Sequence, residues 1–129
     1  MPFSWTPDSK AIIFSSDRNG TLDLFTYALD QSLPEPLVTA PENEFVARLN
    51  PAGTELLYES APASMDAPRS IFAIPLAGGT PRLVLRDKYI VNLQCAQLPS
   101  TLCVYGVTTL GKDVDPQIRP QHRRKFATH

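Results

Sequence analysis

The side chains with the most evident potential for chemistry lie in residues 17–23, where oxygen-bearing side chains stand at alternate positions. This spacing resembles the first part of a calcium-binding loop. An EF-hand loop needs glycine at its sixth place and glutamate at its twelfth, whereas here glycine stands fourth and the twelfth residue is Ala28. We therefore predict no metal site in this segment. We expect Asp17 and Asp23 to accept hydrogen bonds from the nearby backbone or from Arg18.

The two cysteines and two histidines are the other candidates for covalent or metal chemistry. Cys95 and Cys103 are eight residues apart, so they lack the C-x-x-C spacing of metal and redox sites. Both stand beside apolar residues in neighbouring predicted strands. They are therefore either two buried free thiols or a hairpin disulfide around residues 99–100, which would matter only in an oxidising compartment. His122 and His129 have no cysteine or carboxylate at ligand spacing, so we predict no metal ligand there.

Motifs that would indicate catalysis are absent from the sequence. It contains no Gly-x-Ser-x-Gly nucleophile elbow, no P-loop and no dinucleotide-binding glycine pattern. We therefore predict no catalytic residue and no cofactor site, and expect the chain not to be an enzyme. No apolar run approaches the roughly 18 residues of a membrane-spanning helix. The first residues show neither the basic nor the apolar segment of a secretion signal, so the cellular location stays open.

Charge is unevenly distributed along the chain, which has a formal net charge of −1. Residues 1–110 carry seven Lys or Arg and eleven Asp or Glu, whereas residues 111–129 carry five and two. A chain that is acidic over most of its length does not offer the basic face that nucleic acid requires. We therefore expect no nucleic-acid partner, and interpret residues 111–129 as a basic, disordered tail.

Local signals favour short strands joined by turns. The sequence contains 13 prolines in 129 residues, about twice the average usage, and proline interrupts helices. Residues 12–14 form a short apolar run after a proline-containing turn, as expected for a buried strand. The dipeptide at 19–20 is Asn-Gly, a strong hairpin signal because a type I′ turn needs positive φ at both central residues. Folding around it pairs Phe14 with Phe25 across two strands.

An internal repeat organises the first two thirds of the chain. Residues 3–14 align with residues 47–58, so that Pro7 and Pro51 occupy the same place 44 residues apart. A third, weaker unit follows. The predicted division is a first unit that is incomplete at its start, a degenerate second unit, a partial third unit and the tail, over residues 1–40, 41–86, 87–110 and 111–129.

The length of the repeat indicates the fold. A period of about 44 residues with four strand-like segments per unit is typical of a β-propeller blade. Helical repeats of similar length conflict with the prolines. The competing all-β fold is an immunoglobulin-like sandwich, which also has short strands at regular spacing. We predict an all-β chain that forms a partial β-propeller of about two to three four-stranded antiparallel blades.

Two segments of the first unit carry a family resemblance, Trp5-Thr6-Pro7-Asp8-Ser9-Lys10 and Ser16-Asp17-Arg18-Asn19-Gly20-Thr21-Leu22-Asp23-Leu24-Phe25. They resemble the TolB-like propeller repeat, a bacterial relative of WD repeats, whose pattern has glycine at the position of Ser9. The resemblance extends over residues 3–85, although the second unit has Ala52 in place of the aspartate. The residues of the repeat signature, with structural roles, are Trp5, Pro7, Asp8, Asp17, Arg18, Gly20, Asp23, Phe25, Pro51 and Gly53. The family implies a periplasmic location.

The sequence thus predicts a bacterial, non-enzymatic module that binds a protein partner through its blade loops. Blades bury their faces against neighbouring blades. A few blades alone would therefore leave apolar faces partly open to water and prone to self-association, and the residues expected there are Ile12, Phe14, Leu56 and Tyr58. Residues 95–104 resemble a stretch in propellers appended to bacterial serine/threonine kinases and winged-helix regulators, which implies a sensory segment as one alternative. TolB-like propellers also cap prolyl-oligopeptidase-type peptidases, which implies a propeller piece without its catalytic domain as another.

Overall fold

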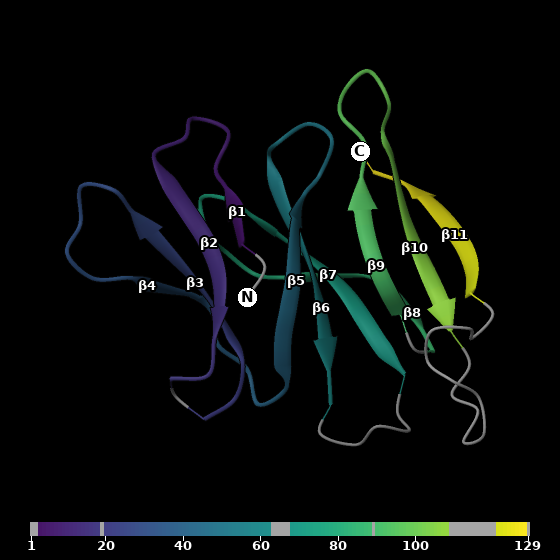
Figure 1. Cartoon of the computed structure of the whole chain (residues 1–129), viewed down its shortest axis with the longest axis horizontal. Helices are drawn as coiled ribbons and strands as arrows, with labels where there is room; N and C mark the ends of the chain where they lie inside the picture. The colour runs from purple at the N-terminus through teal and green to yellow at the C-terminus, as the bar shows by residue number, and fades with distance from the viewer. Residues whose placement is uncertain (1–2, 19, 63–67, 89, 109–120, 129) are drawn as a thin grey trace.

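The computed structural model shows an all-β protein built from three antiparallel sheets (Figure 1). The residues described are 3–18, 20–62, 68–88, 90–108 and 121–128. Within these ranges there is no helix, and hence none that could cross a membrane. The prediction of an all-β, antiparallel fold is confirmed. Three sheets in a row also exclude a two-sheet sandwich.

The strands pair largely with their neighbours in the chain. The first sheet contains β1 (Phe3–Trp5), β2 (Ala11–Ser16), β3 (Asp23–Ala28) and β4 (Glu35–Val38), in that order. The middle sheet contains β5 (Asn43–Leu49), β6 (Glu55–Ala61), β7 (Arg69–Pro75) and β8 (Arg82–Asp87). The third sheet contains β9 (Ile90–Cys95), β10 (Leu102–Thr108) and β11 (Gln121–Ala127), with β10 in the centre. The sheets lie side by side in chain order, and β5 contacts both β2 and β9 (Figure 1).

The first hairpin has the predicted register. Phe14 of β2 lies opposite Phe25 of β3, and their rings stack with centroids 5.9 Å apart. The turn begins one residue earlier than the Asn-Gly pattern predicts, because the amide of Gly20 donates to the carbonyl of Asp17 at 2.9 Å. Asn19, which was expected at the centre of the turn, lies outside the described residues.

The middle sheet is apolar on both of its faces. Successive side chains of a strand point to opposite faces, so Leu56 and Tyr58 of β6 turn toward the first sheet while Leu57 turns toward the third. In β7, Ile74 likewise faces the first sheet, whereas Ile71 faces the third. The unbroken apolar runs of these two strands therefore correspond to a sheet that is covered on both sides.

Two apolar cores lie between the three sheets. The core between the first and middle sheets contains Ile13, Leu24, Val38, Leu56, Tyr58 and Ile74. The core between the middle and third sheets contains Leu57, Ile71, Ala73, Ile90, Leu93, Cys103, Tyr105 and Val107. The first and third sheets consequently each have one face in a core and one outer face.

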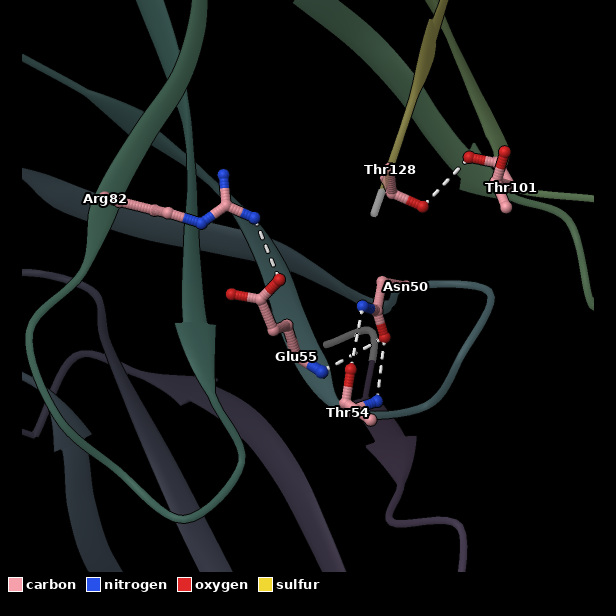
Figure 2. Close-up of polar contacts among 6 residues, drawn as sticks. All are labelled: Asn50, Thr54, Glu55, Arg82, Thr101 and Thr128. Carbon is pink, nitrogen blue, oxygen red and sulfur yellow. Dashed lines mark hydrogen bonds and ion pairs between the residues drawn. The ribbon is translucent and has the colours of Figure 1, made fainter.

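The expectation that residues 111–129 form a disordered tail is wrong for the last part of this segment. Residues 121–127 form β11, which pairs along the whole length of β10. Residues 111–120 lie outside the described residues. Thr128 holds the end of β11 in place. Its hydroxyl donates to the carbonyl of Thr101 at 2.9 Å (Figure 2), and its amide donates to the same carbonyl at 2.7 Å.

One apolar side chain and one paired cation explain why this basic segment is ordered. Phe126 packs against the second core, and its ring centroid lies 6.0 Å from that of Tyr105. Arg124 forms an ion pair with Asp87 of the middle sheet at 3.0 Å. The hydroxyl of Tyr105 donates to the same carboxylate at 3.0 Å. Asp87 thus links β11 and β10 to the neighbouring sheet. The number of charged residues in 111–129 gave no indication of this pairing.

Replacing Phe126 by alanine should loosen the third sheet. Phe126→Ala removes a half-buried ring from the second core, and should lower the free energy of unfolding by about 1–3 kcal/mol. The matched control is Lys125→Ala on the adjacent, exposed position, which should change it by less than about 0.5 kcal/mol. Urea denaturation followed by circular dichroism measures both changes. Equal effects of the two substitutions would show that Phe126 does not anchor β11.

Candidate interaction surface

Three turns occupy equivalent places in the three sheets. Each connects the first strand of its sheet to the second, and they span residues 6–10, 50–54 and 96–101. All three lie at the same end of the molecule (Figure 1). Because loops on a rigid sheet scaffold are common binding surfaces, this end is the first candidate for a functional site.

The first turn is held by two side chains. The Thr6 hydroxyl donates to Oδ1 of Asp8 at 2.6 Å and accepts from the amide of Ala11 at 3.1 Å. The same carboxylate oxygen accepts from the amide of Lys10 at 3.0 Å. The hydrogen bonds from Thr6 and from the Lys10 amide lower the pKa of Asp8. Asp8 therefore has a structural role in closing the turn.

The middle turn satisfies the corresponding amides with a single side chain. Oδ1 of Asn50 accepts from the amides of Thr54 and Glu55 at 2.9 and 3.0 Å, and Nδ2 donates to the Thr54 hydroxyl at 3.1 Å (Figure 2). Asn50 is 3% exposed. One buried asparagine thus replaces the pair of Thr6 and Asp8. This explains how the second unit keeps the turn without the aspartate.

The two turns also share a left-handed backbone position. Ser9 has φ of 58° and Gly53, 44 residues later, has φ of 73°. This region suits glycine and costs a residue with a side chain free energy. A Cβ atom on Gly53 would also lie 3.2 Å from Cγ of Pro7. The first and middle turns therefore pack directly against each other, and Gly53 is the residue that permits the contact.

The three turns enclose a groove of about 570 Å³. Its walls are Pro7 of the first sheet, residues 48–53 of the middle sheet and residues 94–98 of the third. Leu98 is 59% exposed, and the glutamines at 94 and 97 are also exposed. The groove therefore combines apolar surface from prolines and leucines with amide groups that can donate and accept hydrogen bonds.

A second surface lies on the first sheet, on the side away from the middle sheet. Its side chains form two cross-strand rows, Trp5–Ile12–Tyr27 and Phe14–Phe25–Pro36. We call this the outer aromatic face. Arg18 lies at its edge, with Cζ 4.6 Å from the ring centroid of Phe25 and 5.6 Å from that of Phe14. Such cation–π contacts help to cover the rings. Phe25 is only 3% exposed, and the exposed members of the two rows are Trp5 and Pro36.

The signature residues of the repeat are divided among these places and are not gathered at one site. Trp5, Arg18 and Phe25 belong to the outer aromatic face, Pro7, Pro51 and Gly53 to the groove, and Asp8, Asp17 and Gly20 to turns. The hydrogen bond expected from Arg18 to an aspartate is not among the described contacts of Arg18, whose Nε donates to the Ser16 hydroxyl at 3.0 Å.

Two buried carboxyl groups join the first and middle sheets near the first hairpin. Asp23 is 4% exposed and Glu44 is 1% exposed. Burial, together with the side chain of Asp23, raises the pKa of Glu44 to about 8. The uncharged, protonated form of Glu44 is therefore favoured at neutral pH. The amide of Glu44 also donates to the carbonyl of Leu22 at 2.7 Å.

Nothing in the sequence pattern pointed to Glu44. A bulge between Phe45 and Arg48 breaks the alternation of inward and outward positions in β5. The positions that follow the bulge therefore do not predict that Glu44 points inward. A second buried acid, Glu59, faces the other core from β6 and is also 1% exposed. Burial raises its pKa to about 7, and Arg69, whose Nη1 lies 3.9 Å from Oε1, acts in the opposite direction.

The cysteines and histidines, which were the candidates for covalent and metal chemistry, do not gather at one site in the described residues. Cys95 and Cys103 lie directly opposite each other on β9 and β10, with Cα atoms 4.0 Å apart, and form a disulfide. Both belong to or pack against the second core. Within the described ranges, no three His, Cys, Asp or Glu side chains gather to hold a metal ion. His122 belongs to β11, and His129 lies outside the described residues.

Comparison with known proteins identifies the fold. Neither the protein-family models nor the curated proteins give a match. Among solved structures, the chain is similar to a TolB-like protein from Agrobacterium tumefaciens, with a TM-score of 0.58 and 19% sequence identity over 65% of this chain. The matched part is 32% of that chain, so this protein spans about a third of its length. The likeness shows a TolB-like propeller fold.

Exchanging the residues at the shared left-handed position should shift stability in opposite directions. Ser9→Gly should raise the free energy of unfolding by about 0.5–1 kcal/mol, because glycine removes the backbone strain. Gly53→Ala should lower it by about 1–2 kcal/mol, because the new Cβ adds strain and presses on Pro7. Urea denaturation measures both. A loss of stability in Ser9→Gly would contradict the account of this turn.

The buried acids should make the protein less stable as pH rises. The folded state raises the pKa of Glu44 from 4.5 to about 8 and that of Glu59 to about 7, so it retains protons that the unfolded chain releases. Stability is then fully present below pH 4.5 and is lost as pH rises to about 8.

This loss is measurable by denaturation at about pH 5 and about pH 9, and should amount to several kcal/mol. Glu44→Gln should reduce the difference between the two pH values, because a neutral amide cannot ionise. Glu35→Gln, at an exposed glutamate, is the matched control and should leave the difference unchanged. A stability that rises with pH over this range would contradict the burial of these acids.

Proposed function

We propose that this chain is a non-enzymatic protein-interaction module, which binds a segment of its partner in the groove between the three turns. The observation that carries the proposal is that one groove of about 570 Å³ is lined by the equivalent turns of all three sheets. Binding there depends on the relative positions of the sheets, which the two cores fix. A role in binding another protein is also consistent with the TolB-like propeller fold.

The lining of the groove indicates the chemistry of the bound segment. Pro7, Pro51 and Leu98 offer apolar surface, whereas the side chain of Gln97 can hydrogen-bond to backbone N–H and C=O groups. Asn50 is committed to its own turn, so it shapes the groove but has no amide group to spare. An extended peptide with apolar side chains satisfies both kinds of surface.

Selection from a phage-displayed library of random peptides on the immobilised full chain tests the proposal. We expect enriched peptides rich in apolar residues whose binding is weakened at least about 10-fold by Leu98→Asp. Leu33→Asp changes an equally accessible leucine on the loop between β3 and β4, 73% exposed, and should leave binding unchanged. The proposal fails if no peptide is enriched, or if both substitutions affect binding alike.

A further inference from the structure

A pocket of about 500 Å³ lies between the first and middle sheets. The first sheet contributes residues 37–40, at and after the end of β4, and the connection to β5 contributes Glu42. The middle sheet contributes side chains of β5, β6 and β7, together with Pro81. None of these residues lines the groove between the turns. The volume is in the range of pockets that bind small molecules.

Part of this pocket is apolar and aromatic. Tyr58 of β6 and Phe72 of β7 lie opposite each other, and their rings stack with centroids 5.8 Å apart. Leu37 and Pro81 complete this part from the two sheets. Phe72, Leu37 and Pro81 are each only half-buried, so this part of the pocket can cover the apolar body of a ligand. The faces of the rings also attract cations.

The pocket also contains a buried acid whose oxygens are not hydrogen-bonded. Glu44 of β5 lines the pocket and is 1% exposed. Neither of its carboxyl oxygens has a hydrogen-bond partner in the part of the chain that the structure describes. Ser60, opposite Glu44 and two residues along β6 from Tyr58, lines the pocket as well. Because a buried polar group without a partner costs free energy, a ligand that donates hydrogen bonds to Glu44 would be stabilised here.

The charged groups that act on Glu44 are acids. Burial first, and then Asp23 of β3 and Glu42, raise the pKa of Glu44 to about 8. Asp23 is 4% exposed, and Glu42 also lines the pocket. The potential of these acids attracts positive charge. Since no three acidic, histidine or cysteine side chains of the described ranges gather to hold a metal ion, the complementary ligand is an organic cation.

We propose that this pocket binds a small organic cation, a primary ammonium group joined to an apolar body. The ammonium donates hydrogen bonds to the carboxylate of Glu44, and the body lies against the rings of Tyr58 and Phe72. An ammonium has three donors and one positive charge, so it satisfies the oxygens of Glu44 and offsets the repulsion among the acids. The proposal goes beyond the protein-interaction function, because both the ligand and the site are different.

Binding of the ammonium should release a proton from Glu44. The pKa of Glu44 is about 8 in the protein without ligand, whereas an ion pair with the ammonium favours the carboxylate. Well below this pKa, each bound ligand therefore displaces one proton. The affinity should then rise about 10-fold from about pH 6 to about pH 7, and level off above the pKa of Glu44.

The other groups near Glu44 are compatible with this pH dependence. Asp23, Glu42 and Tyr58 face it from β3, the connection before β5, and β6. Burial, and then the charge of Glu44, raise the pKa of Tyr58 to about 12, so its hydroxyl stays neutral in this range. Arg86 of β8 lies on the same face of the sheet, but three strand spacings, or roughly 14 Å, from Glu44. A primary ammonium keeps its proton up to about pH 10.

Calorimetric titration of the full chain with phenethylamine tests the proposal, and phenethyl alcohol is the neutral control ligand of the same shape. We expect a dissociation constant below about 1 mM for the amine at about pH 8, and binding at least about 10-fold weaker for the alcohol. Titration at about pH 6.5 in two buffers of different ionisation enthalpy should show about one proton released per amine bound. No binding of the amine, equal binding of the alcohol, or no proton release would overturn the proposal.

Two equally buried glutamates provide the variant and its control. Glu44→Gln should weaken binding of the amine at least about 10-fold and remove its pH dependence, because an amide has neither a charge nor a proton to release. Glu59→Gln changes an acid that is also 1% exposed but faces the other core, and should leave binding unchanged. Equal loss in both variants would contradict the proposal. If circular dichroism shows that Glu44→Gln is not folded, the proton count on the unmodified chain decides.

A lysine side chain of another protein presents the same ammonium group, so a further ligand separates the two sources. Lysine amide, acetylated at its α-amino group, should bind more weakly than phenethylamine, because it has no ring to lie against Tyr58 and Phe72. Tighter binding of the lysine compound would overturn the assignment to a free amine. Leu98→Asp, in the groove, should leave amine binding unchanged. A failed peptide selection would therefore not affect this test.

Discussion

The burial of the middle sheet on both faces is the constraint on which the rest of this structure depends. Leu56 and Leu57 are neighbours in β6, yet they belong to two different cores. A strand of this kind can fold only when a sheet stands on each side of it. The first and third sheets are therefore held in place by the same two strands. The groove between the turns exists because this arrangement fixes the sheets relative to one another.

Burial on both faces also affects the ionisation of acidic side chains in the middle sheet. Glu44 and Glu59 face opposite cores and are almost completely buried. A buried carboxylate is costly, and burial accordingly raises the pKa of Glu44 to about 8 and that of Glu59 to about 7, which favours their uncharged forms. The ion pair of Arg82 with Glu55, at 2.8 Å, lies at the surface (Figure 2). It contributes little to the stability of the fold because solvent screens the two charges.

Much of the fold could be predicted from local rules. The prolines, the apolar runs and the pairing of Phe14 with Phe25 depend on neighbouring residues and on strand periodicity, and they indicated short antiparallel strands correctly. The strand at residues 121–127 could not be predicted in this way, because its stability comes from Phe126 in a core built by distant residues. The same holds for Glu44, whose pKa depends on its burial between two sheets and on Asp23 of the other sheet.

The candidate site was predictable only in part. Pro7 and Pro51 marked equivalent turns in the sequence, but their joint groove depends on how the sheets pack, which no local pattern records. The disulfide was one of two open alternatives, since spacing alone does not place Cys95 opposite Cys103. The exchange of Thr6 and Asp8 for Asn50 shows why the repeat was faint: the backbone geometry is kept while the side chains that hold it differ.

Amide hydrogen exchange of the full chain tests the central role of the middle sheet most directly. Amides of β6 and β7 should be the slowest to exchange, because opening them exposes both cores at once, whereas β1, β4 and β11 should exchange faster. The opposite order, with the first or third sheet protected longer than β6 and β7, would contradict the claim that the middle sheet holds the structure together.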